Sequence, residues 1–336
     1  MNSVASLSEK LLTAAFQAHA SDIHFFPFPH ETQIYFRIHG QRSHHQTIAT
    51  STYQLLLTYY KFTSGMDIGE IRKPQNGTIA HHTSMMNYDL RLSTLPLHPL
   101  ESLAIRILPQ HEQLTPDQLF LFPNQLKEIK RWMKNHAGII LLTGPTGSGK
   151  TTTLYALLQM TLKNKSFQAI TLEDPIEKDI DDILQVQVNE KAGVTYQSGL
   201  RAALRHDPDI IMIGEIRDDE TAQFAFEASL TGHLVLSTLH AKNAEGTIYR
   251  LLEMGLNKTD LQQSLIAIAA LQLLPIQVNG QVKRRAAILE LLDERYIEAI
   301  LNEQQLSKRN IQTFDHLRKK AYAYGFISKE TFLSNL

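Results

Sequence analysis

One octapeptide limits the folds open to this chain more than any other feature. It reads Gly-Pro-Thr-Gly-Ser-Gly-Lys-Thr over residues 144–151, between the apolar run 139–142 and a segment with leucines at helical spacing. This is the P-loop pattern in the strand-to-helix context that its chemistry needs. The glycines let successive backbone N–H groups turn around phosphate oxygens at a helix N-terminus. The segment therefore predicts an α/β domain that binds a nucleoside triphosphate.

The residues of this loop have separate tasks in phosphate binding. In the pattern, the lysine reaches the β- and γ-phosphates and the hydroxyl that follows it ligates Mg²⁺. We therefore expect ATP and Mg²⁺ as the cofactors. The expected ATP-binding residues are Gly144, Pro145, Thr146, Gly147, Ser148, Gly149, Lys150, Thr151 and Thr152.

Polar residues follow three later apolar runs. Glu173 comes after 169–172, Glu215 closes the segment after 210–213, and His240 lies just beyond the run around 234–236. Ligands of open parallel sheets bind outside the carboxyl ends of the strands, so these side chains are candidates for the catalytic site. We assign Glu215, together with Thr151, to Mg²⁺, partly through water. Glu173 is expected to position the attacking water, and His240 to sense the γ-phosphate.

The chain length favours two domains. Residues 1–109 predict a mixed α+β domain, with helices near 7–15 and 51–62, strands at 34–38, 88–93 and 103–108, and a turn at Asn76-Gly77. Residues 110–123, punctuated by Pro116 and Pro123, are expected to form a linker. Residues 124–336 alternate apolar runs with helical segments, which predicts a parallel sheet covered by helices. The last part, 286–336, is expected to be mostly helical.

Composition excludes several classes of function. The formal net charge is -1, which disfavours direct nucleic acid binding. The chain has no cysteine, so disulfides and thiolate metal sites are excluded, and no zinc is expected. Residues 1–12 lack a secretory signal pattern. The longest apolar stretch, 265–278, is too short to span a bilayer, so any link to a membrane is expected to run through a partner or a surface contact.

Three segments taken together resemble the secretion ATPase superfamily, the motors of type II secretion and type IV pili. Thr171–Glu177 is similar to its aspartate box, Asp209–Glu215 to its atypical Walker B segment, and Gly232–His240 to its histidine box. The resemblance extends over nearly the whole chain. It also covers Ala20-Ser21-Asp22-Ile23-His24, Arg37-Ile38-His39-Gly40, the segment 201–219 and the end near 314–327.

The resemblance implies a hexameric ring at the cytoplasmic face of the cell membrane, working on an integral membrane platform protein. Each chain would hold a PAS-like α+β domain, a flexible linker and a RecA-like P-loop ATPase domain with C-terminal helices, with nucleotide hydrolysed between the two domains. It also implies two arginines that reach the phosphates from the N-terminal domain. The matching positions are Arg91 and Arg106.

The sequence gives this arginine pair separate support. If the strands around them form a hairpin with Thr94 opposite Leu103, counting back places Arg91 opposite Arg106. Like charges repel across a ladder, so this register makes sense when an anion lies between them.

Departures from the family pattern narrow the choice of subfamily that the chain resembles. No cysteine occurs over 275–287, where many assembly motors carry a zinc module, and Leu271-Gln272-Leu273 stands where the family usually has Gln-Arg-Leu. The compact form most resembles competence-pilus motors of Gram-positive bacteria, which implies pilus assembly for DNA uptake. A type II secretion or retraction motor, a DNA-translocating ATPase and a nucleotide-gated scaffold with little turnover stay open as alternatives.

Overall fold

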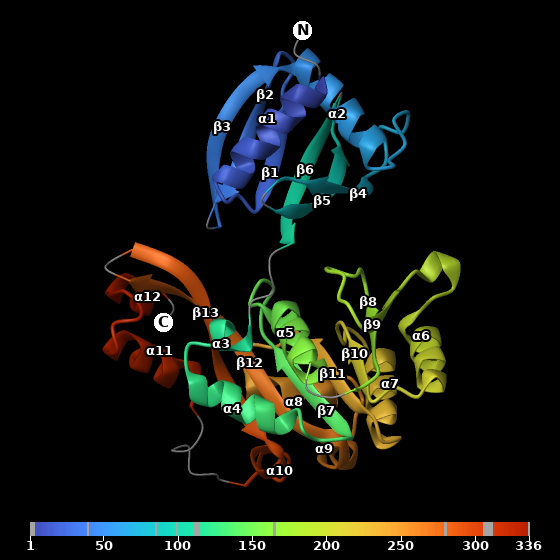
Figure 1. Ribbon diagram of the computed structural model, residues 1–336, viewed down its shortest axis with the longest axis vertical. Coiled ribbons are helices and arrows are strands. Elements are labelled where there is room, and N and C mark those ends of the chain that lie inside the picture. The colour runs from blue at the N-terminus through green and yellow to red at the C-terminus, as the bar shows by residue number, and fades with distance from the viewer. Residues whose placement is uncertain are drawn as a thin grey trace. The chain divides into compact units, whose positions relative to one another are not determined.

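The structure is a computed structural model that describes residues 4–38, 40–84, 86–98, 100–110, 115–163, 166–278, 281–304 and 312–334. His39, part of one of the matching segments, lies outside the described residues. The chain divides into two compact units, residues 1–112 and 113–336, each with its own core. Figure 1 shows the elements of each unit.

The first unit is an antiparallel sheet with two helices packed on it. Its described strands lie in the order β3-β2-β1-β6-β5-β4. Phe25, Ile34, Leu90 and Ile105 are buried with residues of both helices in one core. This is the expected PAS-like α+β arrangement. The elements are α1 (Val4–Gln17), β1 (Asp22–Pro27), β2 (Glu31–Ile38), β3 (Gln41–Ala49), α2 (Thr50–Thr63), β4 (Gln75–His82), β5 (Asn87–Pro96) and β6 (Glu101–Gln110).

One turn expected in this unit is wrong. Asn76 and Gly77 lie inside β4, opposite Ser93 and Leu92 of β5. Gly77 is needed for a close approach, because a Cβ there would lie 2.6 Å from the backbone oxygen of Ser64. A glycine in a strand can mark such a contact as well as a turn.

The second unit is a seven-stranded sheet, counted over its described residues, in the order β13-β12-β7-β11-β10-β8-β9. All neighbours are parallel except β12 and β13. Its strands are β7 (Gly138–Thr143), β8 (Ala169–Glu173), β9 (Ile183–Gln187), β10 (Ile210–Ile213), β11 (Leu234–Leu239), β12 (Leu265–Val278) and β13 (Gln281–Asp293). The four expected apolar runs are thus β7, β8, β10 and β11, and the RecA-like architecture is confirmed.

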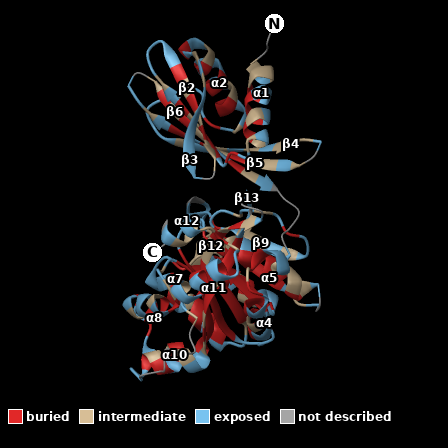
Figure 2. Cartoon of the chain, turned by 90° about the vertical axis from the view of Figure 1, so that its left-hand side faces the viewer, coloured by how far each residue is buried: buried red, intermediate tan, exposed pale blue. Residues whose placement is uncertain are grey.

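Helices cover both faces of this sheet, and the strand residues alternate between two cores. Ile140 and Leu142 face α5 and α4, whereas Ile139 and Leu141 face the helices from α6 to α10. Figure 2 shows the sheet of this unit as its most buried part. The helices are α3 (Pro116–Leu119), α4 (Pro123–Trp132), α5 (Lys150–Leu162), η1 (Glu190–Ala192), α6 (Tyr196–Ala203), η2 (Leu204–His206), α7 (Asp219–Leu230), α8 (Ala244–Glu253), α9 (Lys258–Ser264), α10 (Glu294–Leu301), α11 (Phe314–Ala323) and α12 (Lys329–Ser334).

Two segments of this unit differ from expectation. Residues 286–293 were expected in a helical end but belong to β13, which pairs with β12 and supports α11. Their apolar residues fit a helical period and a buried strand equally well, so the long-range pairing decides. Residues 115–123, expected within the linker, hold α3, and Phe120 forms a bridge with Ala287. This part of the segment packs on the second unit because Leu119, Phe120 and Phe122 are buried there.

Candidate active site

The P-loop joins the end of β7 to the start of α5. The backbone φ angles of Gly144, Gly147 and Gly149 are +148°, +79° and +90°, values that residues other than glycine rarely adopt. A Cβ on Gly144 would also lie 2.7 Å from the carbonyl oxygen of Leu271. Gly149 is the N-cap of α5, so the helix begins at Lys150 with its N–H groups at the loop. The loop therefore has the backbone geometry that the expected phosphate cradle needs.

Lys150 is buried and is held by the loop itself. Its Nζ donates hydrogen bonds to the carbonyl oxygens of Gly144, at 2.9 Å, and of Pro145, at 3.2 Å. Burial lowers the pKa of Lys150, and the carboxylates of Glu215 and Glu177 oppose that shift. Among the described residues, the hydrogen-bond acceptors of this buried ammonium are neutral carbonyl oxygens, so an anion beside it would be stabilising.

Three hydroxyls near Lys150 complete this part of the site. The buried Oγ of Ser148 has no hydrogen-bond partner among the described residues, as expected where a ligand supplies one. Thr151 is partly exposed and Thr152 exposed in the first turn of α5. Loop, lysine and hydroxyls fit a nucleotide phosphate chain with its Mg²⁺.

Parallel strand register brings the acidic residues and the histidine to the same edge as the loop. Ile213 of β10 pairs with Leu172 of β8 on one side and Ser237 of β11 on the other. Leu239 of β11 pairs with Thr143 of β7, directly before the P-loop. Since Glu173 is the last residue of β8 and Glu215 and His240 follow β10 and β11, the loop and the three side chains lie along one carboxyl edge.

Glu215 is the centre of a polar cluster at this edge. Its Oε1 lies 2.8 Å from Nε2 of His240, and its Oε2 accepts from Nε of Arg217 at 2.9 Å. Arg217 also donates to Oδ2 of Asp174 at 3.1 Å. The hydrogen bond and charge of Glu215 raise the pKa of Arg217. Glu215 and His240, chosen from separate segments, are therefore in direct contact.

Glu173 has a different environment. It is 2% exposed, and its Oε1 accepts hydrogen bonds from Oγ1 of Thr171 at 2.6 Å and Nε2 of Gln185 at 3.2 Å. Its Oε2 accepts a hydrogen bond from the hydroxyl of Tyr155 on α5. These three donors compensate the burial of the carboxylate and fix its orientation.

The arginine pair lies in the first unit. Arg91 of β5 is directly opposite Arg106 of β6, and Thr94 is opposite Leu103, so the expected register is confirmed. Nε of Arg106 donates to Oδ1 of Asp22 at 3.1 Å, and Arg106 remains largely exposed. The two guanidinium groups therefore belong to one face of the sheet.

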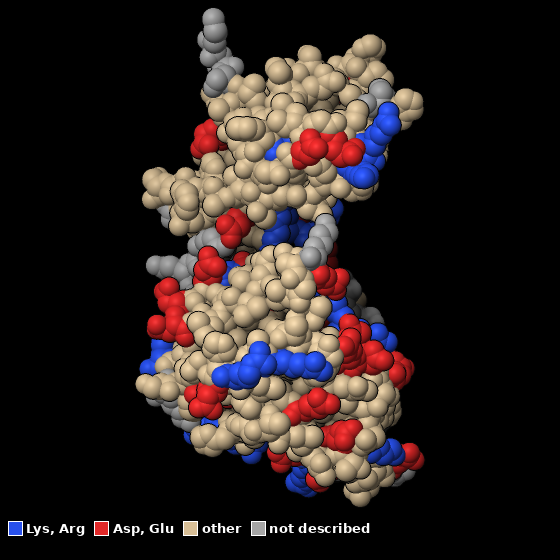
Figure 3. All heavy atoms as spheres, turned by 90° about the vertical axis from the view of Figure 1, so that its right-hand side faces the viewer, with Lys and Arg blue, Asp and Glu red and all other residues tan. Residues whose placement is uncertain are grey.

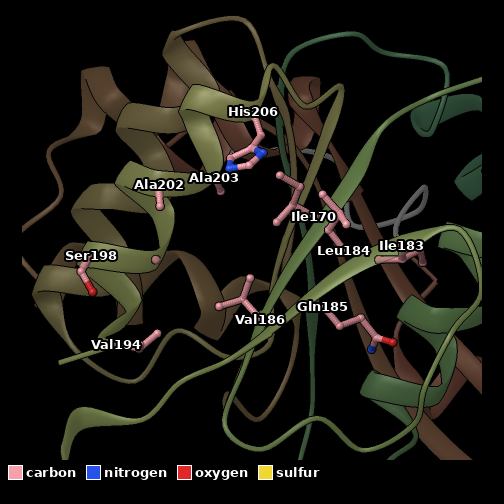
Figure 4. A pocket seen from close by; sticks show the side chains of 11 residues that line it. Ile170, Ile183, Leu184, Gln185, Val186, Val194, Ser198, Ala202, Ala203 and His206 are labelled. Carbon is pink, nitrogen blue, oxygen red and sulfur yellow. The ribbon is translucent and has the colours of Figure 1, made fainter. Parts of the chain in front are cut away.

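A cavity among the described residues lies away from the P-loop. It measures about 470 Å³ and lies between β8 and β9 on one side and α6 with η2 on the other. Figure 4 shows Ile170, Leu184 and Val186 facing Ala202, Ala203 and His206 across it. Gln185 lines the cavity and also donates to Glu173, so the cavity borders the site through this side chain.

Sequence reasoning missed three residues of the site. Arg217 stands two positions after Glu215, so its place in the segment after the strand could have identified it. Tyr155 lies among the buried leucines of α5 and Gln185 lies in a strand that was not expected, so neither carried a signal.

At the position of the usual family arginine, Gln272 accepts a hydrogen bond from Arg318 of α11 at 2.9 Å.

The fold and this edge define a P-loop ATPase of the RecA-like class. The model of the family described as "Type II/IV secretion system protein" matches residues 1–323, and the chain belongs to that family. It is 42% identical to the competence protein ComGA of Bacillus subtilis, over 99% of this chain and 98% of that protein. ComGA of Halalkalibacterium halodurans is 41% identical, with 98% of each chain covered.

Solved structures agree on the fold. The pilus retraction motor PilT with bound ADP has a TM-score of 0.73 at 26% identity, covering 97% of this chain and 95% of that one. The Legionella pneumophila ATPase DotB has a TM-score of 0.77 at 21% identity, covering 97% and 94%, and supports the fold alone. Together with the family assignment, these matches identify the chain as an ATPase of a secretion or pilus machine.

Within the described ranges, no group of three His, Asp or Glu side chains is placed to hold a metal ion. Thr151 and Glu215 are the residues that would hold Mg²⁺, together with phosphate oxygens of the nucleotide, which is the usual mode of this ion at such sites. None of the described helices has both the length and the apolar character needed to span a membrane.

Proposed function

We propose that this protein is a hexameric ATPase motor that powers assembly of a competence type IV pilus or pseudopilus used in DNA uptake. The observation that carries the catalytic part is the single carboxyl edge on which the P-loop, Glu173, Glu215 and His240 lie. The 42% identity to a competence protein over nearly the full length of both chains supports the biological part.

The proposed reaction is in-line attack of water on the γ-phosphate. Lys150 and the P-loop N–H groups hold the phosphates, and Glu173 orients the water. When bound through Thr151 and Glu215, partly by water, Mg²⁺ would neutralise charge on the phosphate oxygens. His240, in contact with Glu215, is proposed to report on the γ-phosphate, and Arg91 and Arg106 are proposed to add positive charge to the phosphates.

The machine around this reaction is proposed from the family. The working form would be a homo-hexamer bound peripherally at the cytoplasmic face of the membrane, and it would act on an integral membrane platform protein. Direct nucleic acid binding is not part of the proposal. On the face in Figure 3, acidic and basic side chains are interspersed over the second unit, in keeping with the net charge of -1.

Other motors of the superfamily and a scaffold with little turnover are the competing functions. The type II secretion protein HxcR of Pseudomonas aeruginosa is 42% identical over 78% of this chain but only 56% of its own length. PilT is a retraction motor by its name. The fuller coverage of the competence proteins favours assembly over type II secretion, and their identity of 42% and 41%, against 26% for PilT, favours assembly over retraction.

The test is ATPase activity against protein concentration, for wild type, Lys150→Ala and Glu215→Gln. Activity should rise cooperatively with concentration and disappear in both variants, since a ring shares its sites and both side chains serve the phosphates. Lys242→Ala and Glu227→Gln make the same changes at exposed positions and should leave the activity unchanged. A wild-type protein that binds ATP tightly without turnover at any concentration would favour the scaffold.

A further inference from the structure

Tyr155 links the helix that follows the P-loop to the carboxylate of Glu173. It stands four positions after Thr151 on α5, so the two residues share one face of that helix, one turn apart. Its side chain is buried in the core between α5 and the sheet. No motif of the sequence includes this tyrosine.

The hydroxyl of Tyr155 is fixed on both of its sides. It donates to Oε2 of Glu173, and it accepts a hydrogen bond from the backbone N–H of Glu177 at 3.4 Å. The accepted bond, from the segment that follows β8, leaves the hydroxyl proton directed at the carboxylate.

Tyr155 keeps that proton at neutral pH. Burial raises the pKa of Tyr155, and the hydrogen bond to Glu173 raises it further. The tyrosine is therefore the donor of this pair, and the glutamate is the acceptor.

The carboxylate of Glu173 has one accepting direction left. A carboxylate offers about four lone-pair directions, two on each oxygen. Among the described residues, two donors reach Oε1 and one reaches Oε2. The remaining direction is on Oε2, the oxygen that Tyr155 holds.

We propose that Tyr155 is a positioning residue for ATP hydrolysis, because its hydroxyl orients Oε2 of Glu173 so that this oxygen accepts a hydrogen bond from the attacking water. The inference rests on the proposed role of Glu173 in orienting that water. Helix α5 would then have two roles. Its N-terminus would bind the phosphates, and Tyr155, one turn further along, would orient the carboxylate of Glu173.

The test compares Tyr155→Phe, Glu173→Gln and the double variant with wild type. Tyr155→Phe keeps the buried ring and removes the hydroxyl, so kcat should fall about 10- to 100-fold, as expected for loss of a hydrogen bond to a charged group. The KM for ATP and the binding of ATP should stay within about twofold, because the change affects the transition state only. The double variant should have the activity of Glu173→Gln alone.

Tyr249→Phe is the matched control. Tyr249 is an exposed tyrosine of α8 whose hydroxyl also lies near a glutamate, 3.4 Å from Oε1 of Glu245. Its loss should leave kcat unchanged.

The outcomes separate this inference from the role of Glu173. If Glu173→Gln is inactive but Tyr155→Phe has the wild-type kcat, Tyr155 has no positioning role. A double variant with a kcat well below that of Glu173→Gln would mean that Tyr155 acts by another route. A Tyr155→Phe protein that no longer binds ATP would show a structural role. Either result overturns the inference. Wild-type kcat in Glu173→Gln would overturn the proposed role of Glu173 itself.

Discussion

Arg91 lies directly opposite Arg106 on the paired strands β5 and β6, and this places two like charges side by side in the first unit. Such a pair costs stability unless an acid or an anion compensates it. Asp22 compensates Arg106 through the 3.1 Å contact between Nε and Oδ1. A phosphate chain would supply further negative charge to the same face.

Replacing either arginine of this pair by alanine should reduce catalysis far more than stability. We expect kcat to fall at least about 100-fold in Arg91→Ala and in Arg106→Ala, because each variant removes a guanidinium that would stabilise negative charge in the transition state. The free energy of unfolding should change by less than about 1 kcal/mol, because Arg106 is largely exposed, Arg91 is only half-buried and Asp22 keeps its contact with Arg37. Steady-state ATPase assays and urea unfolding measure the two effects.

The control for the arginine pair is Arg42→Ala in the same sheet. Arg42 is exposed on β3, where its guanidinium lies over the ring of Tyr35 at 4.5 Å. This variant should retain wild-type ATPase activity. If both Arg91→Ala and Arg106→Ala had the wild-type kcat, the pair would have no role in the proposed catalytic site.

The buried ion pair of Lys61 and Glu101 should be the most sensitive point of the first unit. Nζ of Lys61 lies 2.6 Å from Oε2 of Glu101, and the two side chains are 2% and 5% exposed. Lys61→Met leaves the carboxylate buried without a counter-charge, so the free energy of unfolding should fall by about 3–5 kcal/mol. The double variant Lys61→Met with Glu101→Leu should be more stable than Lys61→Met. Urea unfolding of all three proteins is the measurement, and a double variant less stable than Lys61→Met would contradict the explanation.

Glu290 should make the stability depend on pH above its unfolded pKa. The ordinary pKa of a glutamate is 4.5, and burial raises the pKa of Glu290 above this value in the folded protein. Hydrogen bonds from the backbone N–H groups of Phe314 and Ala244 oppose this rise. Between 4.5 and the raised value the folded state binds more protons than the unfolded state, so stability falls as pH rises through this window. In Glu290→Gln this fall should be absent.

Urea midpoints across that window test the prediction for Glu290. The control is Glu298→Gln, an exposed position of α10, which should keep the slope of wild type. An unchanged slope in Glu290→Gln would assign the pH dependence to other groups.

Gly77→Ala should destabilise the first unit. The new Cβ would lie 2.6 Å from the backbone oxygen of Ser64, so β4 or the end of α2 must shift, at a cost of about 1–3 kcal/mol. At Gly69 the nearest atom to such a Cβ is Oδ1 of Asp67 at 3.4 Å, so Gly69→Ala should cost less than about 0.5 kcal/mol. Equal urea midpoints for the two variants would count against the close approach.

Much of the fold could be predicted from local patterns. The strands β7, β8, β10 and β11 are short apolar runs with helices between them, and the hairpin register followed from counting residues. The errors fall where one pattern fits two structures. Residues 286–293 are rich in alanine and leucine, which favour a helix, yet pairing with β12 makes them a strand.

The sequence by itself determined the nucleotide chemistry of this protein. Phosphate binding depends on glycines, a lysine and a hydroxyl in consecutive positions, and parallel strands bring the residues after them to one edge. Only the tertiary structure decided how the acidic side chains at that edge are held. The contact of Glu173 with Tyr155 and that of Glu215 with His240 join residues 18 and 25 positions apart, and burial and orientation of a carboxylate depend on such packing rather than on local sequence.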